Sequence, residues 1–219
     1  MNFAFGMNNG LALSISRHFG AGDERGMRRA VGWMVTLSVA VSLVLTFASL
    51  LGRNALLTAL QVPAEVWDGA SAYLTLILLG IPLTMLYNME AALLRAVGNS
   101  VTPLLFLLFS SVLNIGLDVA FMGPLGMGVR GAAWATVLGQ LVSMALGLVF
   151  HLRYNREITN GLRYWRPSRS VIVHIYAIGL PAIISQALLT VMTYALNLIL
   201  GAIPQVGQNA VTVYGLYYK

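Results

Sequence analysis

The sequence contains no cysteine and very few charged residues. Without cysteine, disulfides, cysteine-ligated metal sites and thiol nucleophiles are excluded. Only 9% of the 219 residues are charged, whereas a soluble globular domain averages about 25%. So few charges cannot cover the surface of a water-soluble protein of this size, and the mean hydropathy of +0.78 agrees. A soluble enzyme and a disordered regulator are therefore excluded.

Motifs that carry enzyme or channel chemistry are also missing from the sequence. It contains no P-loop, no HExxH and no TVGYG-like filter. The three histidines, His18, His151 and His174, are far apart in sequence, which leaves little room for a metal cluster. We therefore expect no catalytic residue, no metal and no cofactor.

Long apolar runs are the dominant feature of the chain. About 20 apolar residues in a helix cross the ~30 Å hydrocarbon core of a membrane. Runs of this kind lie at roughly 30–51, 69–89, 101–123 and 131–150, with one more predicted at about 174–200 and the beginning of another from about 208. The fold class predicted is an all-α, polytopic transmembrane helix bundle, with the lipid bilayer as its main partner.

Both ends of the sequence resemble parts of membrane helices. Residues 1–16 are apolar but shorter than a full span, and the last residues, from 211, read as the first third of another. We therefore expect the chain to be a piece of a longer protein whose missing transmembrane helices are further partners.

Basic residues predict the orientation of the bundle. The sequence has 13 Lys and Arg against 7 Asp and Glu. If the spans alternate, 17–29, Arg95 and 151–169 lie on one side and hold ten of the basic residues. The positive-inside rule makes that side cytoplasmic in a multi-pass protein of the cell membrane. Because the charge is spread over separate loops, nucleic acid is not an expected partner.

Two acidic residues, Asp118 and Glu90, lie within the predicted spans. Ionisable groups in a bilayer are costly and by default mark a functional site. Asn114 and Asp118 share one helix face, and Thr136 on the next helix lies at the same predicted depth, ~7–8 Å from the outer end. We predict that Asn114, Asp118 and Thr136 form one polar site for a cation or proton. The alternative is a buried Asp118 that only bonds Asn114 and locks the packing.

Glu90 receives a simpler interpretation. It lies near the inner end of its span, five residues before Arg95, where a long side chain can extend to cytoplasmic water. We therefore assign it no function, although Asn88 beside it is a candidate for lining an inner cavity. Asp23 and Glu24 precede a basic helix start and are predicted as N-terminal caps.

Other uncharged polar residues and two prolines within the spans have less specific interpretations. Gln140, Gln186 and Thr190 are candidates for a substrate cavity, although hydrogen bonding between helices explains such residues equally well. Pro82 and Pro181 remove backbone hydrogen bonds and should kink their helices, so they are hinge candidates.

Four segments carry a more specific pattern. They are SISRHFGAGDERGMRRAVG (14–32), ALLRAVGNSVTP (92–103), NIGLDVAF followed by GVRGAAWATVLGQ (114–121 and 128–140), and IGLPAIISQ (178–186). In this order they resemble loops and helices of the multidrug and toxic compound extrusion (MATE) transporters, over nearly the whole chain. The resemblance implies part of a twelve-helix, two-lobe transporter, covering helices two to seven and the start of eight.

The resemblance also implies a division of the chain and a mechanism. Residues 1–150 would be the N-terminal lobe without its first helix, 151–170 a cytoplasmic interfacial linker, and 171–219 the start of the C-terminal lobe. Such transporters export cationic or amphiphilic small molecules in exchange for H⁺ or Na⁺. Their first-lobe cation site uses an Asp and an Asn on helix five and a Thr on helix six, which match Asp118, Asn114 and Thr136. An Asp on helix one completes that site, and no counterpart of this helix is present here.

Three alternatives remain open at the level of sequence. A lipid-linked oligosaccharide flippase of the related superfamily would show more charge in its central cavity. A membrane-embedded enzyme would need a cluster of His, Asp or Ser at one depth. A truncated product without transport activity would at most serve as an interaction subunit.

Overall fold

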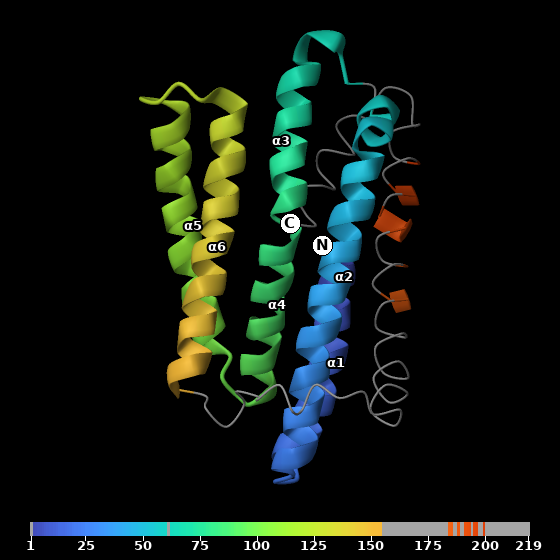
Figure 1. The fold of residues 1–219 in the computed structure, drawn as a ribbon, viewed down its shortest axis with the longest axis vertical. Helices are drawn as coiled ribbons and strands as arrows, with labels where there is room; N and C mark the ends of the chain where they lie inside the picture. Colours follow the sequence, from blue (N-terminus) through green and yellow to red (C-terminus); the bar gives the residue numbers. More distant parts are fainter. Residues whose placement is uncertain are drawn as a thin grey trace.

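The computed structural model describes residues 2–60 and 62–154, together with a few separate helical positions between 184 and 199. Every regular element in these ranges is a helix, as predicted. In chain order they are α1 (Asn2–Gly20), α2 (Glu24–Ala59), the short 3₁₀ helix η1 (Ala64–Val66), α3 (Trp67–Leu79), α4 (Ile81–Ala96), α5 (Val101–Met122) and α6 (Gly128–Tyr154). The elements form a bundle of near-parallel rods (Figure 1).

Four helical segments in the described part are long and apolar enough to cross a membrane. They are α2, the α3–α4 pair with η1, α5 and α6. Their number agrees with the sequence prediction, but α2 is longer than expected, at 36 residues. α6 continues to Tyr154 and so includes the first residues of the segment predicted as a linker.

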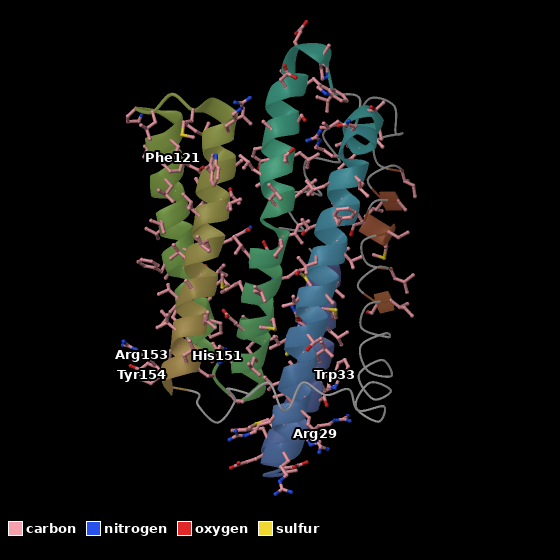
Figure 2. The ribbon with its side chains drawn as sticks, in the orientation of Figure 1. Arg29, Trp33, Phe121, His151, Arg153 and Tyr154 are labelled. Atoms are coloured by element: carbon pink, nitrogen blue, oxygen red, sulfur yellow. The ribbon has the colours of Figure 1, made fainter. Side chains whose placement is uncertain are left out.

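The described connections place basic residues at one end of the bundle. The α1–α2 and α4–α5 connections and the last turn of α6 all lie at this end, opposite the α2–α3 and α5–α6 connections (Figure 1). Figure 2 shows Arg29 and Arg153 there, on different helices. We call it the arginine-rich end.

The apolar core lies where α1, α2 and α4 meet. Methionines Met27, Met34, Met85 and Met89 are buried in it around Ile15. Unbranched, flexible methionine side chains fill irregular gaps between helices. α5 instead packs mainly against α6, and its outward side carries exposed leucines suited to lipid.

A buried polar link ties the same three helices together. Asn8 on α1 accepts a hydrogen bond from the Ser38 hydroxyl at 2.9 Å and donates to the Met85 carbonyl at 3.4 Å. Both side chains are almost fully buried. Such bonds between helices help to fix their relative positions where water cannot compete.

The α6 helix approaches its neighbours through small residues. Every fourth residue along one ridge is small and buried, namely Gly131, Ala135, Gly139, Ser143 and Gly147. Small side chains let helix backbones come close together in a membrane. This ridge lets α6 lie between α5 on one side and α3 and α4 on the other (Figure 1).

The helix interruption predicted near Pro82 falls at Gly80. α3 ends at Leu79 and α4 begins at Ile81, so Pro82 lies in the first turn of a new helix, where its missing N–H is tolerated. A Cβ atom on Gly80 would be 3.2 Å from both Gln140 Oε1 and a methyl of Val137. The break is therefore also a point of close approach to α6.

The predicted cap at the start of α2 is confirmed for Asp23. Its Oδ1 accepts a hydrogen bond from the Gly26 N–H at 2.9 Å, and its Oδ2 lies 3.1 Å from the His18 ring. The Gly26 bond, which stabilises the ionised carboxylate, holds the pKa of Asp23 below its ordinary value of 3.8.

This cap predicts an acid-dependent loss of stability. A lowered pKa in the folded state means that the stabilisation is present above the unfolded-state pKa and is lost as pH falls through the folded-state pKa. We expect Asp23→Ala to lower the unfolding temperature slightly at pH 7. Well below pH 3.8, the variant and the wild-type protein should unfold at the same temperature. Thermal unfolding in lipid, with the exposed Glu65→Gln as the matched control, measures this. An equal effect of Asp23→Ala at both pH values would contradict it.

Candidate functional site

A polar cavity of about 550 Å³ lies between α4, α5 and α6. Four of the predicted site residues line it, namely Asn88, Asn114, Thr136 and Gln140. Further polar lining comes from Thr84, Tyr87, Ser110, Ser111 and Ser143. The side chains that line it in the described part are uncharged, so it presents hydrogen-bonding groups without fixed charge.

Two glycine contacts define how α5 and α6 face each other. A Cβ atom on Gly131 would be 2.9 Å from the Phe121 Cβ, and one on Gly139 would be 3.3 Å from the Asn114 Cβ. Since the two helices run in opposite directions (Figure 1), Asp118 is level with Trp134 and Ala135. At 1.5 Å rise per residue, Asp118 and Thr136 are therefore within ~3 Å of each other along the helix axis.

Asp118 lies one helical turn from Asn114, toward the α5–α6 connection. Its side chain is half-buried, and its Oδ1 is fully buried without a hydrogen-bond partner. Asp118 is not among the residues that line the cavity. Buried polar atoms are nearly always hydrogen-bonded, so an unpaired carboxylate oxygen requires an explanation.

The two residues predicted to accompany Asp118 differ in their bonding. The Asn114 Nδ2 is buried and has no partner. The Thr136 hydroxyl donates to the Ala132 carbonyl of its own helix at 3.0 Å, which leaves its oxygen lone pairs as acceptors. A carboxylate, an amide and a hydroxyl are oxygen ligands of the kind that hard cations prefer. Whether the three converge on one cation stays a prediction.

The opposite side of the cavity is built by the middle of α4. The Asn88 Nδ2 donates to the Thr84 carbonyl at 2.8 Å, and the Tyr87 hydroxyl donates to the Pro103 carbonyl at 2.9 Å. The second bond joins α4 to the first turn of α5. Asn88 therefore lies on a wall of this cavity, and contact with a substrate stays a prediction.

The interpretation of Glu90 is wrong. The side chain does not extend to water but is 5% exposed, between α4 and α6. A Cβ atom on Gly147 would overlap the Glu90 Oε2, so the carboxyl group lies directly over this glycine. The sequence signal that was missed is the glycine on α6, which leaves room for a side chain from a neighbouring helix.

Some predictions fall outside the described residues. The side chains of Gln186 and Thr190, the proposed kink at Pro181 and the segments 155–170 and 171–183 belong to this group. Within the described part, no group of three or more His, Asp or Glu residues is arranged to hold a metal ion.

Comparison with known proteins shows a consistent set of relatives. The MatE family model matches residues 1–120. The chain is 28% identical over 215 residues to "Probable multidrug resistance protein YpnP" of Bacillus subtilis. The matched region covers 98% of this chain and 47% of the relative. It is 26% identical over 215 residues to "Multidrug export protein MepA" of Staphylococcus saprophyticus, with 98% and 47% coverage. The chain thus spans about half the length of these curated relatives.

A solved structure shows the same arrangement of helices. It is described as the outward-facing conformation of a multidrug resistance MATE family transporter of the MOP superfamily. The TM-score is 0.86 at 28% sequence identity, over 99% of this chain and 48% of that one. The similarity therefore extends to the fold as well as the sequence.

Proposed function

This chain belongs to the MatE family. We propose that it carries the coupling-cation site of an antiporter that exports cationic or amphiphilic small molecules in exchange for H⁺ or Na⁺. Asp118 binds the coupling cation, with Asn114 and Thr136 beside it. The cavity between α4, α5 and α6 receives the exported molecule. Opening alternates between the two sides of the membrane as helix bundles rock against each other.

The observation that carries this proposal is the unpaired Oδ1 of Asp118. An ionised carboxylate held away from water without a partner is unfavourable, whereas a bound proton or cation removes that cost. The neighbouring Asn114 amide is also unsatisfied. Because the Asn114 Nδ2 is an N–H donor, a packing bond to the Asp118 Oδ1 would have satisfied both atoms, and both are unpaired.

The chemistry of the cavity supports a small-molecule substrate. Ring and amide groups from Tyr87, Asn88 and Gln140 provide stacking and hydrogen-bonding surfaces. The absence of charged side chains from its described lining favours a drug-like organic molecule over a phosphate-bearing lipid-linked sugar. In this scheme Asp118 supplies negative charge near the cavity but outside its lining.

The positions of the arginines support an orientation. The α1–α2 and α4–α5 connections and the last turn of α6 meet at the arginine-rich end (Figure 1), and an excess of basic residues is typical of cytoplasmic loops. We therefore assign the arginine-rich end to the cytoplasm. Asp118, near the opposite end of α5, then lies in the outer half of the membrane.

A gradient-driven dye assay tests the proposed function. The protein, expressed from its own gene in cells that lack other drug pumps, is assayed in inverted membrane vesicles with ethidium as the cationic probe. An imposed H⁺ or Na⁺ gradient should drive dye accumulation above that of vesicles without the protein, and collapsing the gradient should release the dye. Accumulation equal to that of empty vesicles under both gradients would reject the proposal.

A further inference from the structure

A second acidic residue in the bundle is buried without a full set of partners. Glu90 on α4 is 5% exposed, and its Oε2 is a buried atom with no hydrogen-bond partner. This carboxyl group lies over Gly147 of α6. Neither Asp118 nor the predicted cation site accounts for it.

The position of Glu90 along the bundle separates it from Asp118. Glu90 is level with Gly147, and Asp118 is level with about Ala135. The two levels are twelve positions apart along α6, which corresponds to ~18 Å at 1.5 Å per residue. Glu90 therefore lies in the half of the bundle toward the arginine-rich end.

The polar cavity lies between the two carboxyl groups. Along α6 its lining runs from Thr136 to Ser143. Ser143 is one turn before Gly147 on the same buried ridge, so the Glu90 carboxyl group adjoins the cavity end nearest the arginine-rich end. Near that end of α6, where Figure 2 shows His151, the His151 Nε2 lies 3.5 Å from the Glu90 carbonyl oxygen.

A proton is the ligand that these surroundings fit. A sodium or divalent cation needs several oxygen ligands around it, but no described side chain bonds the Glu90 Oε2. A proton needs only the carboxyl oxygen itself and converts a costly buried anion into a neutral group.

We propose that Glu90 is a second proton-binding residue of this transporter, located at the inner end of the cavity. The proposal rests on the function proposed above and extends it. The Glu90 carboxyl group holds a proton while α4 and α6 are packed over it. It exchanges that proton with water at the arginine-rich end when the two helices separate.

The other titratable groups near Glu90 are few in the described part. His151 faces it from α6, and Tyr87 and Arg95 lie on α4 itself. Since Glu90 is buried over Gly147 of α6, separation of α4 and α6 is the movement that brings water to its carboxyl group in this proposal.

Infrared spectroscopy of the purified protein in lipid nanodiscs tests this directly. A protonated carboxyl group has a C=O stretching band that an ionised one lacks. At pH 7 we expect such a band in the wild-type protein, lost in Glu90→Gln and retained in Asp118→Asn. Identical spectra of wild-type protein and Glu90→Gln in this region would show an ionised Glu90 and overturn the proposal.

A glycine substitution provides an independent test if Glu90→Gln folds poorly. The Cβ atom in Gly147→Ala would displace the Glu90 carboxyl group, so the C=O band should shift or disappear. Gly116→Ala is the matched control, because a Cβ there meets nothing within 4 Å. An unchanged band in Gly147→Ala would contradict the burial geometry that the proposal requires.

The same variants separate this proposal from the proposed function. In the vesicle assay, Glu90→Gln should lose the dependence of dye transport on pH at the arginine-rich side. If Glu90→Gln keeps a normal pH dependence while Asp118→Asn loses transport, the proton-binding role of Glu90 is rejected and the proposed function of Asp118 is not. Normal coupled transport in Asp118→Asn would reject the Asp118 cation site, and the infrared band of Glu90 would still report its proton.

Discussion

Replacing Asp118 with Asn is expected to abolish gradient-driven dye transport. The amide keeps the size of the side chain but can neither bind a proton at neutral pH nor neutralise a sodium ion. The buried, unpaired Oδ1 is the group on which coupling depends in our account. Initial rates of ethidium uptake into inverted vesicles, with an imposed H⁺ or Na⁺ gradient, measure the effect.

Two further variants make the Asp118 result specific. Asp118→Glu keeps the charge and should retain part of the coupled rate. Asp68→Asn removes an acid that is exposed in the first turn of α3 and should behave as the wild-type protein. Coupled uptake by Asp118→Asn equal to that of Asp68→Asn would reject the cation site.

Gly139→Leu is expected to prevent α5 from packing against α6. A Cβ atom at this position would already lie 3.3 Å from the Asn114 Cβ and 3.4 Å from the Ser110 carbonyl oxygen. Added side-chain volume in a packed interface costs about 1–3 kcal/mol and often more, and a leucine here must displace the helix that carries Asp118. We expect a large loss of folded protein, measured as the monodisperse yield in detergent and as the thermal unfolding temperature.

Gly116→Leu is the control for this packing prediction. Gly116 is exposed on α5, and nothing lies within 4 Å of a Cβ atom there. The same change of residue should therefore leave yield and unfolding temperature near those of the wild-type protein. Equal losses in both variants would mean that helix propensity, and not the α5–α6 contact, determines the effect.

Much of the fold could be predicted because the membrane restricts the choices. Backbone groups in hydrocarbon must be satisfied internally, so long apolar runs can only be helices. Arg17, Arg95 and Arg153 then mark which connections share one end of the bundle. The bounds of α2 were harder to predict, since Arg53 lies inside the helix and donates to Thr75 of α3 at 2.8 Å instead of ending the span.

The site was only partly predictable for a different reason. Asn114 and Thr136 could be paired from helical spacing and a short connection. In adjacent antiparallel helices, residues at the same distance from the connection lie side by side. The burial of Glu90 depends on Gly147, which lies 57 positions later on a helix packed beside it. Sequence spacing within one helix carries no information about such a contact, so the side chain was wrongly expected to reach water.

The most direct test of the central claim is the pH and Na⁺ dependence of ethidium binding to the purified protein in lipid nanodiscs. If cation and substrate exclude each other at a site coupled to Asp118, the dye affinity must fall as the coupling cation is added. For one exchanged proton the dissociation constant should rise by up to about tenfold per pH unit on acidification. We predict this dependence in the wild-type protein and its loss in Asp118→Asn. Equal dependence of both proteins on pH and on Na⁺ would contradict the claim.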